Sequence, residues 1–226
     1  MVIESPQPPH KQWLPTATSR RFLTTTEAAT YFSELFVTHG LESLAQRSAL
    51  NLNTRSRWFQ GCALFVLDYG VPVRITPEGL SDFFLIQIPL AGSVHMRVGD
   101  KEVLSTPQRA SLPPTDQPAV ITWHQESPHL MVYLPRDIVE ETARKLYGVS
   151  SAAGLTLAHF LDLETPRGQR FMIALKEFHD DLESIPLGGL TSVTTVSLES
   201  MVMRLLLAID HSLSRSLPMT EIGRAS

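Results

Sequence analysis

The sequence predicts an α+β fold in which an antiparallel β-sandwich, jelly roll or small barrel is followed by two long helices. Three observations carry this prediction. Strand-like segments crowd residues 61–134, and turn residues separate them roughly every 8–12 residues. After Pro135 the spacing of apolar residues changes from a strand period to a helical one.

Composition sets the class of protein. The chain has 226 residues, of which 43% are hydrophobic, and a formal net charge of −4. These are ordinary values for a globular protein with a sizeable core. A nucleic-acid-binding module normally shows a basic face, so we do not expect this stretch itself to bind DNA.

The N-terminus and the single cysteine indicate the compartment. Residues 1–20 contain four prolines and no apolar run, which predicts a flexible arm and no signal peptide. Cys62 has no partner for a disulfide, and we expect it to be a small buried residue in a reducing compartment. No apolar run approaches about 18 residues, so we expect a cytoplasmic protein with no membrane segment.

Eight strands are expected in the β region. Ser93–Val98 alternates cleanly between apolar and polar residues, whereas Phe83–Leu90 is an apolar run broken by Gln87. Upstream, the alternation around Leu50 and Leu52 also favours a strand. The eight expected strands are Cys62–Asp68, Val71–Thr76, Phe83–Leu90, Ser93–Val98, Glu102–Leu104, Ala110–Leu112, Ala119–Trp123 and Leu130–Leu134.

Helices are expected on both sides of this region. Thr24, three residues before Glu27, forms a capping-box pattern for a first helix that ends at Gly40. A second helix follows Pro135 and stops at Gly148. Two longer helices then carry apolar stripes and, with a short connection, should pack antiparallel. Their stripes are Phe171, Leu175, Phe178, Leu182 and Ile185, and Leu198, Val202, Leu205, Ile209 and Leu213. These stripes either cover the barrel or pair with a second subunit.

Signals of catalysis are weak. The chain has eight histidines but no His-x-His pair, which metal-dependent jelly-roll enzymes typically use. It also has no G-x-S-x-G elbow, no P-loop and no G-x-G-x-x-G. We therefore expect no catalytic residues, no metal and no cofactor.

The sequence still allows the protein to bind a small molecule, because a closed eight-stranded barrel can hold one small ligand. Polar residues in apolar strands are the best candidates for contacts, since burying them unpaired costs free energy. The six candidates are Arg74, Gln87, Trp123, His129, Met131 and Tyr133. Four of them have an alternative: Gln87 can satisfy backbone groups, Arg74 can point to solvent, and Trp123 and Tyr133 can be core residues.

Several segments together resemble the N-terminal domain of AraC/XylS-family transcription regulators, in the variant found in regulators of aromatic catabolism. The segments that carry the resemblance are Asp68-Tyr69-Gly70, Val73-Arg74-Ile75, Gly79-Leu80, Leu85–Ile88, Leu90-Ala91-Gly92, Pro113–Gln117, Ile121-Thr122-Trp123 and Val132–Pro135. The likeness covers roughly Trp58 to Tyr147.

The resemblance implies a cupin-like β-barrel that holds a small effector, followed by an antiparallel helical pair used for homodimerisation. Four segments follow from it: a flexible arm (1–20) that can lie over the pocket, an effector-binding barrel with an N-terminal helix (21–135), a helical dimerisation region (136–215) and a linker stub (216–226). By position, His129, Met131 and Tyr133 match the last barrel strand, which contributes pocket side chains in sugar-sensing members.

One departure is large. Family members carry a C-terminal domain with two helix-turn-helix units, and this sequence stops where that domain should begin. We therefore expect a sensor and dimerisation domain that reaches DNA only through a separate domain. The resemblance leaves open whether the effector is aromatic. Two alternatives also remain open: a metal-dependent cupin enzyme (dioxygenase or isomerase), and a structural dimerisation module with a filled barrel.

Overall fold

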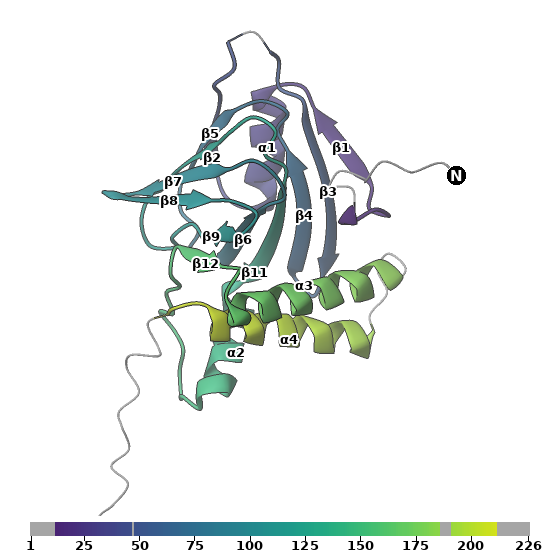
Figure 1. The fold of residues 1–226 in the computed structure, drawn as a ribbon, viewed down its shortest axis with the longest axis vertical. Coiled ribbons are helices and arrows are strands. Elements are labelled where there is room, and N and C mark those ends of the chain that lie inside the picture. Colours follow the sequence, from purple (N-terminus) through teal and green to yellow (C-terminus); the bar gives the residue numbers. More distant parts are fainter. Residues whose placement is uncertain (1–11, 47, 186–190, 212–226) are drawn as a thin grey trace, which may run out of the picture.

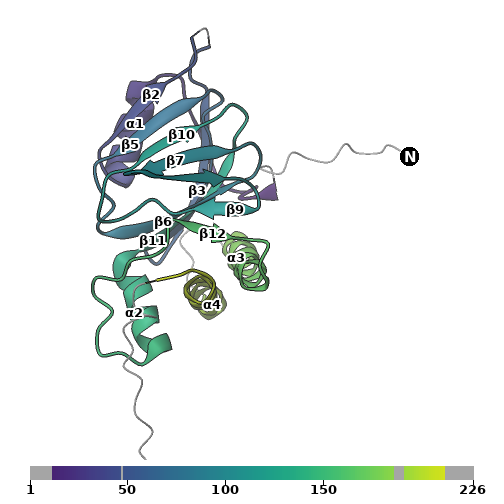
Figure 2. The ribbon, with the colours of Figure 1, turned by 60° about the vertical axis from the view of Figure 1, so that its left-hand side comes forward.

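The structure, a computed structural model, describes residues 12–46, 48–185 and 191–211. Its strands form two antiparallel sheets that face each other in a jelly-roll sandwich (Figures 1 and 2). The sheet of seven strands runs in the order β1 (Ser19–Phe22), β3 (Leu52–Phe59), β4 (Cys62–Asp68), β11 (His129–Pro135), β6 (Phe83–Pro89), β9 (Arg109–Ser111) and β12 (Phe160–Asp162). The sheet of five strands runs in the order β2 (His39–Ser43), β5 (Val73–Pro77), β10 (Val120–Trp123), β7 (Val94–Val98) and β8 (Lys101–Ser105).

Both faces of the seven-stranded sheet are buried. In β4, Phe65 and Leu67 point toward the five-stranded sheet and join an inner core between the two sheets. Leu64 and Val66 point the other way and join an outer core against the helices. This explains why β4 and β6 read as continuous apolar runs, since a strand buried on both faces has no polar alternation.

Of the four helices in the described residues, three lie on the outer side of the seven-stranded sheet. These are α2 (Arg136–Tyr147), α3 (Pro166–Ser184) and α4 (Ser192–Ala208). The long helices α3 and α4 lie side by side below the sheet (Figure 2). The remaining helix, α1 (Thr25–Leu35), lies at the other side of the sandwich, close to β2.

Local chemistry sets where the helices begin and end. Thr24 caps α1 by accepting a hydrogen bond from the Glu27 amide, and Thr165 and Thr191 cap α3 and α4 in the same way. Gly148 ends α2 in the left-handed conformation, with φ of 64°.

The α+β jelly roll with its helical pair is confirmed. Each of the eight expected strands is present within a residue or two, and the upstream alternation is β3. Three short strands, β1, β2 and β12, were not expected. Helix α1 ends at Leu35 instead of Gly40, because the chain has already turned into β2 by His39.

The apolar stripes of α3 and α4 are used within the chain. Four of the five stripe residues of α3, and Leu198, Val202, Leu205 and Ile209 of α4, are buried in the outer core. Ile185 is partly buried against that core, and Leu213 lies outside the described residues. The stripes therefore cover the sheet and are not free for a second subunit. Across the part of the chain that the structure describes, no helix is long and apolar enough to cross a membrane.

Candidate functional site

A narrow cavity of about 60 Å³ lies between the two sheets. Its wall combines residues of the inner core with two aromatic side chains of α1, and most of it is apolar. The residues that line it are Phe32, Phe36, Val37, His39, Leu67, Tyr69, Ile75, Pro77, Leu80, Phe83, Leu85, Gln87, Pro113, Ile121, Trp123 and Met131.

Three of the six candidate residues meet at this cavity. Gln87 on β6, Trp123 on β10 and Met131 on β11 all line it and are all buried. Gln87 and Met131 are register partners on neighbouring strands, so their side chains point to the same face. Trp123 comes from the opposite sheet. The inward-facing positions of three strands therefore bring these residues together.

The polar atoms of this group are only partly satisfied. The Gln87 carbonyl accepts a hydrogen bond of 3.3 Å from the Ser111 hydroxyl. The Trp123 indole Nε1 is buried and has no hydrogen-bond partner among the described residues. A buried N–H without an acceptor costs about 1–3 kcal/mol, so this donor is suited to a ligand or an ordered water.

His129 lies behind Trp123 and does not line the cavity. The two rings pack with their centroids 3.7 Å apart. The His129 Nδ1 lies 2.7 Å from the Ser127 carbonyl, which can only accept, so Nδ1 carries the proton and Nε2 is a bare acceptor. Burial lowers the pKa of His129 to about 3, with the Ser127 hydrogen bond as an opposing influence. His129 is therefore neutral and adds no charge to the inner core.

The other two candidates lie elsewhere. Tyr133 is half-buried at the far end of β11, where its ring packs 4.7 Å from Phe83 and 5.5 Å from Phe36. Arg74 does not point between the sheets. It lies on the exposed face of the five-stranded sheet and donates a 2.9 Å hydrogen bond to Glu42 on β2. Its neighbours Val73 and Ile75 face inward, so the alternation of a strand forces Arg74 outward.

Sequence reasoning missed the contribution of α1. Phe32 and Phe36 line the cavity, and with Phe22 and Tyr31 they form an aromatic group over the inner core. The density of aromatic residues on one face of this helix was the available signal.

A second hollow, an open groove of about 800 Å³, lies on the surface. It runs between residues 112–117, residues 156–160 and the end of the described chain at Asp210 and His211. Charged side chains of both signs line it, among them Arg109 and Asp116. The groove is much larger than the inner cavity, and its lining is more polar.

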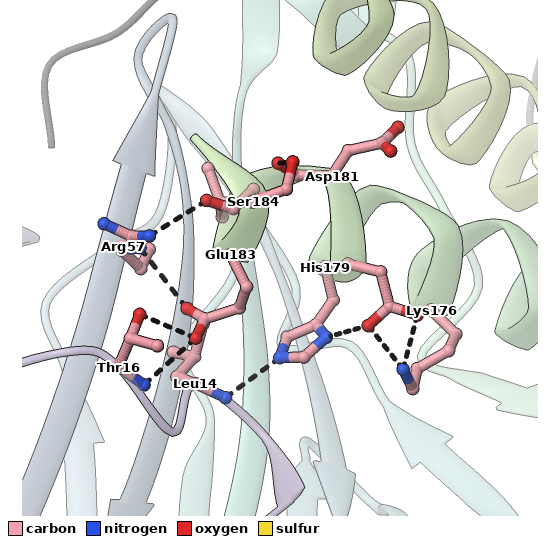
Figure 3. Close-up of polar contacts among 10 residues, drawn as sticks. Leu14, Thr16, Arg57, Lys176, His179, Asp181, Glu183 and Ser184 are labelled. Carbon is pink, nitrogen blue, oxygen red and sulfur yellow. Dashed lines mark hydrogen bonds and ion pairs between the residues drawn. The ribbon is translucent and has the colours of Figure 1, made fainter. Parts of the chain in front are cut away.

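Residues 13–17 are clasped against α3 and β3 (Figure 3). The Leu14 amide donates to the His179 Nε2 at 2.9 Å, and the Thr16 amide and hydroxyl both donate to the Glu183 carboxylate. Arg57 donates to the other oxygen of Glu183 at 3.3 Å. Leu14 has a φ of 51°, a strained value for this residue, which these contacts and its complete burial maintain.

This clasp bears on the expected arm. Trp13 and Leu14 belong to the outer core, on the helix side of the seven-stranded sheet. Trp13 and Leu14 therefore lie on the side of the seven-stranded sheet opposite the cavity. Residues 1–11 and the linker stub at 216–226 lie outside the described residues.

We looked for groups of side chains that could bind a metal ion in the described ranges. Within them, no three His, Cys, Asp or Glu side chains come close enough together to hold a metal ion. The histidines nearest the cavity are separated: His129 is occupied by Ser127, and His39 contacts the Val37 carbonyl.

A family model described as an AraC-binding-like domain matches residues 28–207. The chain belongs to this AraC-binding-like family. The match begins within α1, includes β2 to β12 but not β1, and ends at the last turn of α4, so α2, α3 and most of α1 and α4 are part of the family domain.

One sequence relative and one similar solved structure are described as regulators. The "Probable thc operon regulatory protein" of Rhodococcus erythropolis is 24% identical over 189 residues, covering 82% of this chain and 57% of that protein. This chain thus spans little more than half the length of that relative. The crystal structure of the AraC-like transcriptional activator CuxR matches with a TM-score of 0.62 and 10% identity, covering 85% of this chain and 69% of CuxR. The cupin domain of Schizosaccharomyces pombe Cnp3 aligns over 46% of this chain and 78% of its own, with a TM-score of 0.33 and 12% identity.

Proposed function

We propose that this chain is the effector-sensing and dimerisation domain of a transcription regulator, and that it binds a small organic molecule between its two sheets. The observation that carries the proposal is the buried Trp123 Nε1, which has no partner among the described residues and belongs to a side chain that lines the cavity. Family membership supports the regulatory role. DNA is reached through a separate domain of the regulator.

The contacts of the effector are proposed in two groups. Gln87, Trp123 and Met131 touch it directly, since all three line the cavity. His129 and Tyr133 support that wall, because they pack on Trp123 and on Phe83 respectively. Arg74 is left out because it lies on the exposed outer face.

The signal would cross the seven-stranded sheet through β11. Met131 faces the cavity, while its neighbours Leu130 and Val132 face the outer core with α3 and α4. A shift of β11 that accommodates an effector therefore changes the packing under both long helices. An effector that makes better contacts with the shifted state of β11 would favour that state over the unshifted one.

Dimerisation is assigned to a stripe on α4 that the chain leaves exposed. Val193 and Val196 are 62% and 65% exposed, and Met203 and Leu207 continue the line at heptad spacing. Ser200, between them, fills the same series. We propose that this α4 stripe (Val193, Val196, Met203 and Leu207) pairs with the same stripe of a second copy.

A ligand screen tests the sensing function. The melting temperature of the 226-residue chain is measured against benzoates, phenols, fatty acids, sugars and other small metabolites. We expect at least one class to raise it, and Trp123→Phe to reduce that rise, because Phe keeps the ring but lacks the donor. Arg74→Gln is the matched control and should keep the full rise.

Two results would contradict the proposal. A screen with no stabilising ligand, together with a crystal structure whose cavity stays closed by side chains, would favour a purely structural module. A stoichiometric transition metal in elemental analysis would instead favour a metal-dependent cupin enzyme.

A further inference from the structure

The ring of Phe36, the residue that follows α1, narrows the cavity between the sheets. The cavity of about 60 Å³ is far below the roughly 300–1,000 Å³ of small-molecule sites. Phe36 stacks on Phe32 with a centroid separation of 5.9 Å. Its ring also packs on Phe65, Phe83 and Tyr133 of the seven-stranded sheet, at 5.1, 6.0 and 5.5 Å. Phe36 is partly buried against the inner core and forms part of the cavity wall, so its ring limits the space that is open to a ligand.

Helix α1 packs against the inner core through few buried residues. The helix has 11 residues, of which Ala28 and Phe32 are buried. A helix this short is marginal without its tertiary contacts. At Phe36 the backbone leaves the helix with φ of −123° and ψ of −93°, and β2 begins three residues later. Withdrawing Phe36 breaks side-chain packing but no strand pairing, so it costs less than opening either sheet.

The cavity wall carries no acidic or basic side chain other than His39, which lies on β2 beside the end of α1. Tyr69 lines the wall, and burial raises the pKa of its phenol well above the usual range, so it stays neutral. His129 behind the wall is also neutral. An anionic ligand would thus enter the inner core without a buried countercharge, which costs several kcal/mol.

Within the described ranges, the cavity wall contains one hydrogen-bond donor without an acceptor, the indole N–H of Trp123. Trp123 Nε1 is buried without a partner among the described residues, and the Gln87 carboxamide lies in the same wall. An acceptor on the ligand would satisfy the indole donor without adding charge.

Building on the sensing function, we propose that the effector is an uncharged molecule with one flat apolar ring and a hydrogen-bond acceptor. Its ring takes the place of Phe36, and its acceptor receives the hydrogen bond of Trp123 Nε1. A phenyl ring that withdraws leaves a space of matching shape, and an apolar cavity of about 150 Å³ is enough to bind benzene. Effector binding would then release the end of α1 from the inner core.

Two probes of nearly equal shape test the class of ligand. Benzamide is neutral and benzoate is ionised at neutral pH, so they differ mainly in charge. In the full chain carrying Phe36→Ala, we expect benzamide to bind at least about tenfold more tightly than benzoate by calorimetry. Benzamide should also restore part of the melting temperature that the substitution removes. Adding Trp123→Phe should weaken benzamide about 2- to 10-fold, the value of one hydrogen bond.

Controls separate this site from any hole in a core. Phe59→Ala removes a ring from the outer core, where Phe59 packs beside Phe178. In the Phe59→Ala variant, adding Trp123→Phe should leave the affinity for benzamide unchanged. If Phe36→Ala does not fold by circular dichroism, Phe36→Leu opens less space and answers the same question.

The outcomes distinguish this proposal from the sensing function. Benzoate binding as tightly as benzamide overturns the uncharged class. No binding of either probe to a folded Phe36 variant overturns the replacement of Phe36. In both cases a hit from the library screen that depends on Trp123 leaves sensing intact. A library without any hit contradicts sensing itself, even where the Phe36 variant takes up benzamide.

Discussion

His129 shows how burial alone can set the pH response of this fold. The imidazole is fully buried, and its pKa falls from 6.5 to about 3. Between these values the unfolded chain binds a proton that the folded protein does not. The free energy of unfolding should therefore fall as the pH is lowered from about 6.5 toward 3, by up to about 1.4 kcal/mol per pH unit for this residue.

Chemical denaturation between pH 4.5 and 7.5 measures this effect. We expect His129→Gln to show a shallower fall than the natural sequence, because glutamine has no proton to gain. His95→Gln is the matched control, because it removes an exposed histidine from the outer face of the five-stranded sheet. Equal slopes in all three proteins would contradict the assignment to His129.

Gly168 marks a second residue whose identity is dictated by space. It lies in the first turn of α3, and a Cβ built there would stand 2.1 Å from the Asp162 carbonyl oxygen and 2.7 Å from the Leu163 Cα. Backbone cannot yield as a side chain can, so we expect Gly168→Ala to cost about 1–3 kcal/mol.

Thermal unfolding compares this variant with Gly40→Ala. A Cβ at Gly40 would meet Thr76 at 3.8 Å, an ordinary contact. Gly40→Ala should therefore keep the melting temperature within a degree or two. A Gly168→Ala protein as stable as the natural one would show that β12 and α3 separate easily.

Among the elements, two ion pairs with the same chemistry should differ in energetic weight. Arg57 on β3 and Glu183 on α3 are buried, with side chains 7% and 12% exposed, and Arg57 also donates to the Leu182 and Ile185 carbonyls. Arg74 and Glu42 pair on the exposed sheet face, 47% and 61% exposed. We expect Arg57→Met to cost about 3 kcal/mol, because it removes the guanidinium that pairs with the largely buried Glu183 carboxylate.

The exposed pair supplies the comparison. Arg74→Met should cost less than about 1 kcal/mol. Urea titrations of the two variants, with Glu183→Gln added to Arg57→Met, measure the difference. If the double variant recovers stability, the penalty came from the unpaired carboxylate; an Arg57→Met loss as small as that of Arg74→Met would show that water reaches Glu183.

Elements with strong side-chain patterns were predictable from the sequence, and those held by backbone pairing were not. The alternation of Val94, Met96 and Val98 and the run through Ile86 identified β7 and β6 correctly. Strand β1 carries a largely exposed Ser-Arg-Arg-Phe sequence and is defined by its register with β3, which no local pattern reveals.

The candidate site was predictable to a similar extent. Gln87 was a candidate as a polar residue in an apolar run and Met131 by its place on the last barrel strand, and both line the cavity. Arg74 also stood out in its strand, but its register between Val73 and Ile75 places it outside. The role of Phe36 depends on a helix folding back over the sandwich, and that is a tertiary contact between segments far apart in the sequence.

At the scale of the whole molecule, the α4 stripe determines the expected assembly. Val196→Glu with Met203→Glu places two charges in the stripe without touching the outer core. We expect light scattering after size exclusion to change from a dimer to a monomer, since a like-charge pair in an apolar interface costs several kcal/mol. Circular dichroism should stay unchanged.

The matched control is Ile173→Glu, which places an acid at an exposed apolar position of α3, outside the α4 stripe. It should remain dimeric. A natural chain that is monomeric at all concentrations, or a double variant that is still dimeric, would exclude α4 as the interface.

The seven-stranded sheet separates two packed cores, whereas the five-stranded sheet has water behind it. A change of side-chain size at Met131 or Leu85 requires repacking of the outer core against α3 and α4 as well as of the cavity wall. A change at Ile121 or Val73 can be absorbed by a sheet whose outer face is exposed. We therefore expect descendants of this protein to acquire new ligand preferences through the five-stranded sheet, while the seven-stranded sheet changes slowly. Directed evolution with libraries confined to one sheet at a time would reveal that asymmetry as a difference in the fraction of folded variants.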